Sequence, residues 1–412
     1  MSSPEHRSGF RGATIVLGVT GGIAAYKAAD LTSKLVQLGA RVHVVMTEGA
    51  TRFVQPLTFE ALTRQPVYTS VFDGWEGESA GHVTLAREAD VVLIAPATAS
   101  TIARLVQGAV DDMLGAVVLA TGAPVIVAPA MEHHMWHHPA TQRNVATLAA
   151  WGVHIVAPES GHLASGATGD GRLASSERLI GAVRQQLGSG GPLAGRRIVV
   201  TAGGTREAID PVRYLGNRSS GQMGVAIAEA ALDQGAAVTL IAGPTVERLP
   251  QGVTVRRVES ALEMEQAVHG AIEGADALIM AAAVADFRPR QASDQKIKKQ
   301  PGQESLTIEL ARNPDIIAGV DGTVIVKVGF AAETEALLAN AQGKLEAKDL
   351  AMIVANDAVR TIGSDQAQAT LLFRDGRPAR ELSRMPKEAM ARQIIAELPG
   401  LLEARQRERR HD

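Results

Sequence analysis

The chain has 412 residues, of which 46% are hydrophobic, a formal net charge of −3 and no cysteine. This length accommodates two or three domains with their own cores, the near-neutral charge does not indicate a nucleic-acid surface, and the lack of cysteine excludes disulfides, thiolate metal sites and a cysteine nucleophile. Residues 1–12 are polar and no apolar run reaches membrane-spanning length, so we expect a cytoplasmic protein without a signal peptide or membrane anchor.

The first half begins with the pattern of a parallel α/β domain. The apolar run Thr14–Val19 predicts a buried strand, a glycine turn and a helical pattern follow it as far as Gly39, and residues 42–46 predict the next strand. This order favours a doubly wound parallel sheet. The turn lacks the G-x-G-x-x-G spacing of dinucleotide-binding folds, so a mononucleotide phosphate near Gly21 and Gly22 is favoured over NAD.

Small and hydroxyl side chains follow a later strand of this half. Residues 90–95 and 125–128 predict strands, and residues 96–101 come directly after the first of them, at the position where open α/β sheets bind ligands. His82 precedes a predicted helix. By itself, a histidine at such a position is usually a surface or capping residue.

The sequence HHMWHH at residues 133–138 raises the question of a metal site. His133 and His137, like His134 and His138, have the i,i+4 spacing that brings two side chains together on a helix. A metal would need a third ligand and an oriented second shell, and no residue with recognisable spacing supplies them. Because Pro139 also predicts a break in the helix, we expect a partly exposed segment and no metal centre.

A linker and a polar turn open the second half. Gly188–Gly195 is rich in glycine, so we predict domains at 13–187 and 196–400 with a linker at 188–195. Residues 198–200 predict a buried strand, and the window Thr201–Gly224 leads from it into a helix at 223–232. A strand, a glycine turn and a helix amino terminus form an anion site. The alternative is a solvated loop with a helix cap at Ser219 or Ser220.

The remaining elements continue the α/β pattern. Strands are predicted at residues 237–242, 253–258 and 276–283, with a helix at 261–271. A cluster of lysines, KIKK, follows at residues 296–299; by itself such a cluster is usually a solvated loop. Residues 368–373 and 378–382 predict a hairpin, and residues 386–398 predict a closing helix.

These motifs together resemble a known family. The window TAGGTREAIDPVRYLGNRSSGQMG, with KIKK, ARNPDI, VGFAAET and LEAKDLAMIVAND, resembles the ligase half of the bifunctional phosphopantothenoylcysteine decarboxylase/phosphopantothenate–cysteine ligase family of coenzyme A biosynthesis. The segments GVTGGIAAYK, GHVTLAREAD, IAPATAST and PAMEHHMW resemble its decarboxylase half, over about residues 13–186.

The resemblance implies two doubly wound, Rossmann-like α/β domains, a flavodoxin-like FMN-binding domain and then a nucleotide-binding ligase domain. It implies CTP-dependent ligation of 4′-phosphopantothenate with cysteine through an acyl-cytidylate, with Mg²⁺, and FMN-dependent decarboxylation of the product to 4′-phosphopantetheine. It also implies a homo-oligomer built from trimeric decarboxylase units and dimeric ligase units, in which the hairpin at 368–382 could serve the dimer. Neither a nucleic-acid nor a membrane partner is expected.

The resemblance also assigns site residues. For the decarboxylase it implies His82 as the catalytic histidine, with substrate contacts from Glu132 and Ser165 and flavin contacts from Gly21, Gly22, Ile23, Thr47, Pro96, Ala97, Thr98, Ser100 and Met131. For the ligase it implies catalytic roles for Asn217, Lys296 and Arg213. Substrate contacts there come from Ser219 and Ser220, and nucleotide contacts from Ala282, Asp286, Pro314, Asp315, Ile316, Ile317, Phe330, Lys344 and Lys348.

Two departures from the family pattern leave alternatives open. Glu132 occupies the position of an asparagine that holds the substrate carboxylate, and two carboxylates repel each other unless one is protonated or bridged. Ser165 occupies the position of a flap cysteine that helps to reduce the enethiol. The first half is therefore either a complete decarboxylase, an enzyme that stops at the enethiol, or a flavin-binding regulatory module. A dehydrogenase is disfavoured because the chain lacks both a dinucleotide fingerprint and a Tyr-x-x-x-Lys pair.

Overall fold

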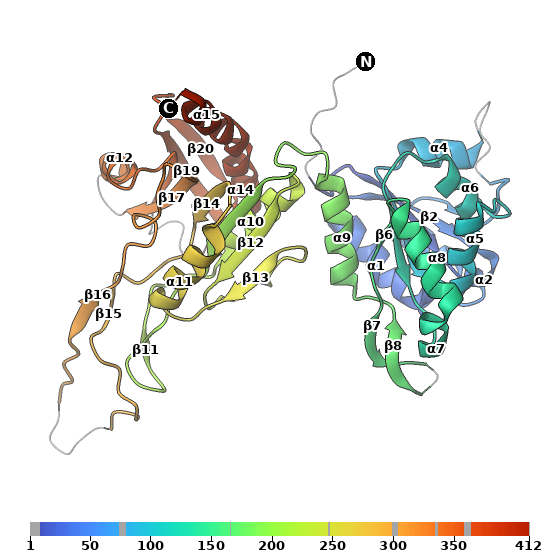
Figure 1. Ribbon diagram of the computed structural model, residues 1–412, viewed down its shortest axis with the longest axis horizontal. Helices are drawn as coiled ribbons and strands as arrows, with labels where there is room; N and C mark the ends of the chain where they lie inside the picture. Colours follow the sequence, from blue (N-terminus) through green and yellow to red (C-terminus); the bar gives the residue numbers. More distant parts are fainter. Residues whose placement is uncertain are drawn as a thin grey trace. The chain divides into compact units, whose positions relative to one another are not determined.

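The computed structural model describes residues 9–73, 80–164, 166–245, 248–298, 304–333, 337–357 and 364–411. The chain forms two compact units, Met1–Ser189 and Gly190–Asp412, which are described here one at a time (Figure 1). Among the described residues, every helix is too short or too polar to cross a membrane.

A parallel sheet forms the centre of the first unit. Its described strands lie in the order β3 (Val67–Tyr68), β2 (Arg41–Met46), β1 (Thr14–Val19), β4 (Val91–Ala97), β5 (Val125–Pro129) and β6 (His154–Ile155). Without the two-residue edge strand β3, this is the 2-1-3-4-5 order of flavodoxin-like sheets. The chain reverses direction across the sheet between β1 and β4, so the crevice at their carboxyl ends is where such folds bind ligands.

Helices cover both faces of this sheet. Buried side chains of α1 (Ala25–Gln37), α3 (Pro56–Thr63) and α9 (Ser176–Gly188) pack on one face. Those of α4 (Gly81–Glu88), α5 (Ala99–Gln107), α6 (Met113–Ala120) and α8 (Pro139–Ala150) pack on the other. Two short helices, α2 (Glu48–Thr51) and α7 (His133–His137), and an antiparallel hairpin of β7 (Glu159–His162) and β8 (Thr168–Arg172) complete the unit.

The second unit has a larger, mixed sheet. In the described part of the chain its strands lie in the order β13 (Thr254–Arg257), β12 (Ala237–Ala242), β9 (Arg197–Ala202), β14 (Ala277–Met280), β17 (Val326–Glu333), β18 (Met352–Asp357), β19 (Gln366–Phe373) and β20 (Arg380–Pro386). The strands from β13 to β18 are parallel, whereas β19 and β20 are antiparallel and form the predicted hairpin.

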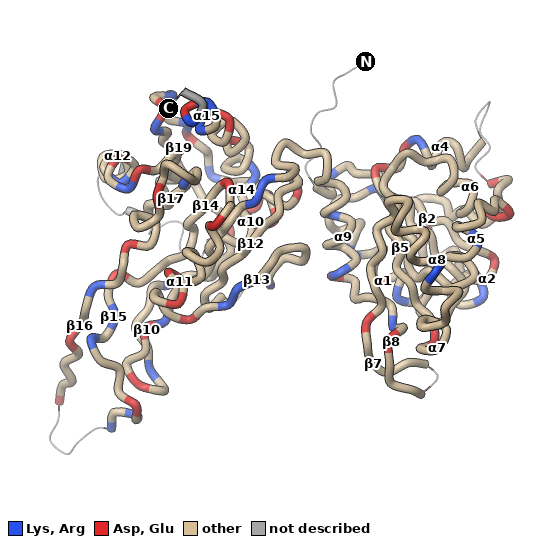
Figure 2. The backbone as a smooth tube through the Cα atoms, viewed as in Figure 1, with Lys and Arg blue, Asp and Glu red and all other residues tan. Residues whose placement is uncertain are grey.

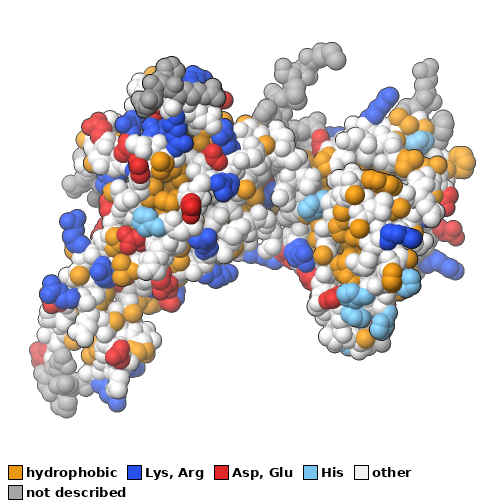
Figure 3. Space-filling model, in the orientation of Figure 1, with side chains coloured by type: hydrophobic (Ala, Val, Ile, Leu, Met, Phe, Trp, Pro, Cys, Tyr) orange, Lys and Arg blue, Asp and Glu red, His pale blue; other side chains and the backbone are white. Residues whose placement is uncertain are grey.

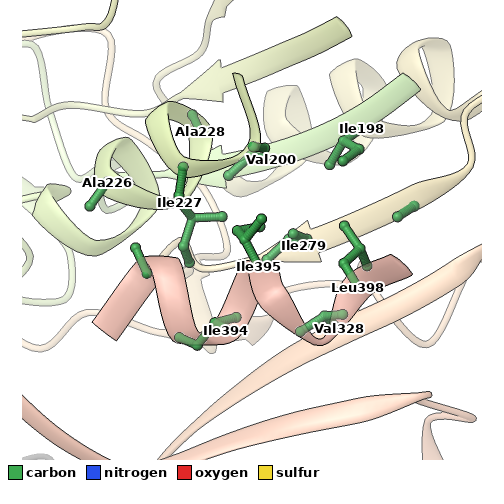
Figure 4. Close-up of a cluster of buried hydrophobic side chains, with 14 of the residues drawn as sticks. Ile198, Val200, Ala226, Ile227, Ala228, Ile279, Val328, Ile394, Ile395 and Leu398 are labelled. Carbon is green, nitrogen blue, oxygen red and sulfur yellow. The ribbon is translucent and has the colours of Figure 1, made fainter. Parts of the chain in front are cut away.

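Buried apolar side chains hold helices against both faces of this second sheet. Helices α10 (Gln222–Asp233), α14 (Lys387–Ala396) and α15 (Leu398–His411) pack on one face, where Ile227 and Ile395 meet Ile279 and Val328 of the sheet (Figure 4). Helices α11 (Ala261–Ile272) and α12 (Leu337–Ala347) cover the other face. Burial of both faces accounts for the continuous apolar runs of the central strands.

Two small antiparallel pairs extend beyond this sheet as an arm that carries charges of both signs (Figures 1 and 2). The pair β15 (Phe287–Pro289) and β16 (Leu310–Arg312) carries the intervening segment with the KIKK cluster, whose Lys299 lies outside the described residues. The pair β10 (Glu207–Ala208) and β11 (Tyr214–Leu215) belongs to the polar turn after β9.

One predicted strand is shorter in the structure than its apolar run suggests. The sequence predicts a strand over residues 276–283, but β14 ends at Met280. The Ala282 N–H donates to the Thr201 hydroxyl (3.1 Å), and the Ala283 N–H donates to the Gly203 carbonyl (2.8 Å), so the chain leaves the ladder and turns. The predicted boundaries of β1 and β12 are confirmed.

Candidate functional site

The site of the second unit begins where β9 and β14 end. The buried hydroxyls of Thr201 and Thr205 accept hydrogen bonds from the backbone N–H groups of Ala282 (3.1 Å) and Ala285 (3.0 Å). Gly204 also forms a parallel bridge with Ala283. The glycine turn after β9 is thus joined to the turn after β14 at the switch point of the sheet.

Next to these turns lies a cavity of about 850 Å³. Most of the ligase residues that the sequence predicts line it: Asn217, Ser219, Ser220, Ala282, Asp286, Pro314, Asp315, Ile316, Ile317, Phe330, Lys344 and Lys348. They come from five separate stretches of sequence that only the parallel sheet brings together. Lys348 forms an ion pair with Asp315 (2.8 Å), which joins the carboxyl end of α12 to the turn that carries Asp315.

The amino terminus of α10 forms part of the cavity wall. The first residue outside this helix is Gly221, in the left-handed conformation (φ 81°), and a β-carbon there would clash with the Thr245 hydroxyl. The hydroxyls of Ser219 and Ser220 accept from the N–H groups of Gly221 (3.2 Å) and Gln222 (3.4 Å). The residue at the amino-terminal capping position is therefore a glycine and not one of the two serines. The twelve-residue helix α10 directs the positive end of its dipole at the cavity.

The sequence motifs did not predict one basic residue that lines this cavity. Lys387, the first residue of α14, lines the cavity and is only 7% exposed. Its Nζ donates to Gln222 Oε1 (3.2 Å), and Gln222 Nε2 donates to Asp365 Oδ1 (3.2 Å). A lysine that begins a helix after a hairpin is an ordinary sequence feature, so its position at the α10 amino terminus is visible only in the fold.

Arg213 and Lys296 are not among the described residues that line the cavity. Arg213 Nε donates to Asp210 Oδ2 (3.0 Å), and its Nη2 donates to the Ile297 carbonyl (2.8 Å). The Ile297 N–H returns a hydrogen bond to Asp210 Oδ2 (3.1 Å). Asp210 and Arg213 thus hold the arm segment next to Lys296, whose own side chain is exposed.

The Asp210 carboxylate is strongly stabilised in its charged form. The Arg213 guanidinium is the largest cause, and the N–H groups of Val212, Ile297 and Arg213 add to it, so the pKa of Asp210 lies far below its usual range. Because the folded-state pKa is depressed, the ionised Asp210 carboxylate stabilises the folded chain fully above the unfolded-state pKa of about 3.9. This stabilisation is lost only as the pH falls through the folded-state pKa.

In the first unit, the predicted flavin residues surround the switch point of the sheet. Thr20 donates its hydroxyl proton to the Pro96 carbonyl (2.7 Å) and accepts from the Thr98 N–H (3.0 Å), which joins the turn after β1 to the turn after β4. Gly21 lies against Gly49, since a β-carbon on Gly21 would be 2.7 Å from the Gly49 carbonyl carbon. Gly22 and Ile23 follow β1, Thr47 follows β2, and Met131 follows the neighbouring strand β5. Ala97 is the last residue of β4, and Ser100 lies in the first turn of α5.

The remaining decarboxylase residues differ in how they are placed. His82 lies in the first turn of α4, and its Nδ1 is buried without a hydrogen-bond partner among the described residues. Glu132 caps α7, because its Oε2 accepts from the N–H groups of His134 (2.7 Å) and Met135 (3.3 Å). The predicted Ser165 lies outside the described residues.

The sequence spacing offers no third ligand for the histidines of HHMWHH, but the structure brings a candidate third ligand to them. Asp170, on β8, brings a carboxylate oxygen to His133 and His137, so that one ligand atom from each residue lies within 4.8 Å of the others. The helix break before Pro139 is confirmed, because α7 ends at His137 and α8 begins at Pro139. Sequence spacing did not reveal Asp170 because the hairpin brings it from more than thirty residues away.

Comparison with known families agrees with this two-part organisation. Residues 3–188 match the family described as flavoprotein, and residues 193–401 match the family described as the DNA/pantothenate metabolism flavoprotein C-terminal domain. The protein is therefore a flavoprotein unit joined to a second α/β unit of pantothenate metabolism.

Relatives that match nearly the whole chain identify its protein family more specifically. The "Coenzyme A biosynthesis bifunctional protein CoaBC" of Bacillus subtilis is 45% identical over 94% of this chain and 97% of that protein. The corresponding proteins of Vibrio parahaemolyticus and Mycobacterium tuberculosis are each 44% identical, over 95% and 92% of this chain and 99% and 95% of their own lengths. The chain belongs to this family of bifunctional coenzyme A biosynthesis proteins and is an enzyme with a decarboxylase half and a ligase half.

Solved structures resemble each unit separately. The crystal structure of the C-terminal domain of a coenzyme A biosynthesis bifunctional protein is 40% identical, with a TM-score of 0.45 over 52% of this chain and 98% of that chain. The FMN-dependent cysteine decarboxylase SpaF is 32% identical, with a TM-score of 0.39 over 43% of this chain and 98% of its own.

The clamp between Asp210 and the arm can be tested by proteolysis. Asp210→Asn removes a carboxylate that is ionised at neutral pH, so we expect trypsin to cleave after Lys296 or Lys298 several-fold faster at pH 7, as measured by mass spectrometry of the fragments. Asp294→Asn, an exposed change in the same segment, is the matched control. Equal cleavage rates for the two variants would contradict the clamp.

Proposed function

We propose that the second unit joins 4′-phosphopantothenate to cysteine at the expense of CTP, and that the first unit, with FMN, decarboxylates the product to 4′-phosphopantetheine. The observation that carries the ligase assignment is the cavity of about 850 Å³ that joins the α10 amino terminus to Asn217, Ala282 and Lys348. The family to which the chain belongs supports the presence of two activities, and their order follows because the product of the ligation is the substrate of the decarboxylation.

The ligation proceeds in two balanced displacements. A carboxylate oxygen of 4′-phosphopantothenate attacks the α-phosphorus of CTP, which forms an acyl-cytidylate and releases pyrophosphate. The amino nitrogen of cysteine then attacks the acyl carbon, which forms the amide and releases CMP and a proton. Both steps develop negative charge on phosphate oxygens, and fixed donors and cations stabilise such charge.

Residues of the second unit divide between binding and charge stabilisation. We assign Phe330, Lys344 and Lys348 to the nucleotide, and Ser219 and Ser220, at the α10 amino terminus, to phosphate groups, because helix amino termini favour anions. Asn217 is positioned for the acyl-cytidylate by its Nδ2, which donates to the Val284 carbonyl (2.9 Å) beside Ala282.

The arm contributes the remaining two predicted residues. Lys296, which lies on the arm and outside the described cavity lining, is assigned to supply an ammonium to the cytidylyl group during its transfer. Arg213 acts as a positioning residue, because its guanidinium holds the Ile297 carbonyl (2.8 Å) next to Lys296.

Mg²⁺ enters this site with the nucleotide. The exposed carboxylate of Asp286 lines the cavity, and the cation is commonly held by one or two carboxylates together with substrate phosphates. Asp286 would therefore hold the cation, which would supply positive charge to the phosphates of CTP.

The first unit fits a flavin mononucleotide. Gly21 and Gly49 lie close together and carry no side chains, so backbone atoms form this part of the switch point. The Thr98 and Ser100 side chains supply hydroxyl groups there. A bound FMN would supply the two-electron oxidation of the cysteine moiety that lets the carboxylate leave as carbon dioxide, and the matching two-electron reduction of the product to the thiol. His82 has a buried Nδ1 that a ligand can satisfy, so we assign it to proton transfer with the substrate.

The contacts of Glu132 leave an alternative function open for the first unit. Its Oε2 is engaged by two backbone N–H groups of α7, so a substrate carboxylate would be held by other groups near it, such as His133 or His134. Ser165 is a weak replacement for a thiol, so we propose that a different group completes the reduction. The alternative is a first half that stops at the enethiol or only binds flavin.

Product analysis tests both halves in one experiment. The full chain receives 4′-phosphopantothenate, cysteine, CTP and Mg²⁺, and mass spectrometry should find 4′-phosphopantetheine. His82→Asn should accumulate phosphopantothenoylcysteine, with decarboxylation slowed at least about 100-fold by loss of a proton-transfer group. Asn217→Ala should make little amide yet still decarboxylate supplied phosphopantothenoylcysteine. Accumulation of the amide or the enethiol by the unmodified protein would instead establish the alternative.

The buried cation of the cavity gives a second prediction. Lys387→Met should raise the KM of an anionic ligase substrate by about tenfold or more, because a hydrogen bond to a charged group contributes about 1.5–3 kcal/mol. Initial rates are measured with 4′-phosphopantothenate and CTP varied in turn. Arg384→Gln, which removes an exposed cation from β20, is the control. Unchanged KM values for both substrates would remove Lys387 from the site.

We also propose that the decarboxylase units form trimers and the ligase units form dimers. Ile23 and Tyr26, beside the flavin turn, are 59% and 62% exposed, as expected for side chains that a second subunit covers. In the described part of the chain, the outer edge of β20 has no neighbouring strand, and such an edge is open to a second copy.

Sedimentation of the 43.2 kDa chain tests this assembly. The expected mass is a multiple of both two and three chains, and Ile23→Asp should lower the mass and the retained flavin together. A monomer would contradict the proposal.

A further inference from the structure

Three metal-ligand side chains converge at the end of the first unit where α7 meets the β7–β8 hairpin. His133 and His137 lie one helical turn apart on α7 and therefore on the same side. Asp170 approaches them from β8, and one ligand atom from each of the three residues lies within 4.8 Å of the others. Figure 3 shows histidine side chains gathered at this end of the unit.

The backbone holds Asp170 in this position. The Met131 N–H donates to the Gly171 carbonyl (2.9 Å), and the Asp170 N–H donates to His133 Nδ1 (3.1 Å). Gly171 has a φ of 137°, and a β-carbon there would clash with the Met131 carbonyl oxygen, whereas a β-carbon at Gly169 would come within 2.7 Å of His133 Nδ1. Glycine on both sides of Asp170 therefore permits the close approach of β8 to α7.

The donor set is already oriented. Asp170 Oδ2 lies 3.1 Å from His137 Nε2, and the Ser160 hydroxyl donates to the other carboxylate oxygen, as an outer-shell partner does in metal sites. Two imidazoles and a carboxylate suit Zn²⁺, with bonds of about 2.0–2.1 Å that place ligand atoms roughly 3.4 Å apart in a tetrahedral site.

We propose that His133, His137 and Asp170 bind a divalent transition-metal ion of the Zn²⁺ type, which fixes the β7–β8 hairpin to α7. His137 Nε2 and Asp170 Oδ2 are already at ligand spacing, and a ring nitrogen of His133 completes the protein ligands once His133 Nδ1 gives up the hydrogen bond from the Asp170 N–H. The fourth position is open to water or another small ligand, as it is in three-ligand zinc sites.

The neighbouring histidines have different surroundings. His138 lies beyond the end of α7 with extended backbone, and its Nδ1 accepts from the Ala140 N–H (3.2 Å) as the cap of α8. The i,i+4 pair of His134 and His138 is therefore not a helical pair. His134 and His138 therefore serve as matched controls, because replacing either one also removes a histidine from the same six-residue segment.

Metal titration of the full chain tests the proposal. After treatment with a chelator, Zn²⁺ affinity is measured by competition with an indicator, and Co²⁺ is added to report the visible absorption of a tetrahedral site. We expect one site per chain, weakened at least about tenfold in His137→Ala and in Asp170→Asn and changed less than about twofold in His134→Ala and His138→Ala. Zn²⁺ should also slow hydrogen exchange of the β8 amides in the unmodified chain but not in Asp170→Asn.

Two results would overturn the proposal. An affinity unchanged in Asp170→Asn would show that exposed histidines bind the metal without the hairpin, which is adventitious binding. Equal losses in the control variants would lead to the same conclusion. Because the three side chains are partly or fully exposed, circular dichroism of each variant should remain that of the unmodified chain, which separates a lost site from a lost fold.

Discussion

Both candidate sites depend on a buried threonine hydroxyl that crosses the switch point of a parallel sheet. In the first unit, Thr20 bonds the backbone of Pro96 and Thr98, and in the second, Thr201 bonds the backbone of Ala282. At a switch point, neighbouring strands lead to helices on opposite faces, so the turns that follow them separate and leave a crevice. A buried hydroxyl with satisfied bonds holds the two sides of that crevice at a fixed spacing, because leaving either partner unpaired would cost free energy.

The two units use this common frame in different ways. The first presents small residues, hydroxyls and exposed apolar side chains at the crevice, which suits a flat cofactor covered by a second subunit. The second adds charge: a helix amino terminus, Lys387 and Lys348 border the cavity, and a clamped arm carries Lys296. The contrast fits the chemistry proposed for each unit, since electron transfer to a flavin needs a shaped and largely apolar surface whereas transfer of a nucleotidyl group needs cations and N–H donors.

Segments distant in sequence are joined at each functional region by a few specific contacts. Asp210 and Arg213 connect the turn after β9 to the segment near residue 297, and Gln222 connects α10 to Asp365 and Lys387. In the first unit, Gly169 and Gly171 let the β7–β8 hairpin approach α7 so closely that Asp170 meets His133 and His137. In each case the contact brings together charged or polar side chains that lie far apart in the sequence.

The sequence by itself determined the class of fold, the family and twelve of the residues that line the cavity. Apolar runs long enough for strands, alternating with glycine turns and helices, allow few arrangements other than doubly wound sheets, and motifs such as DPVR and NRSSG are specific. Tertiary structure decided what depends on contacts across the sheet. It ended β14 at Met280, placed Lys387 in the cavity and Arg213 outside its lining, and brought Asp170 to two histidines. Sequence spacing reports neighbours along one helix or turn, whereas these positions depend on strand order and on close backbone approach at particular glycines.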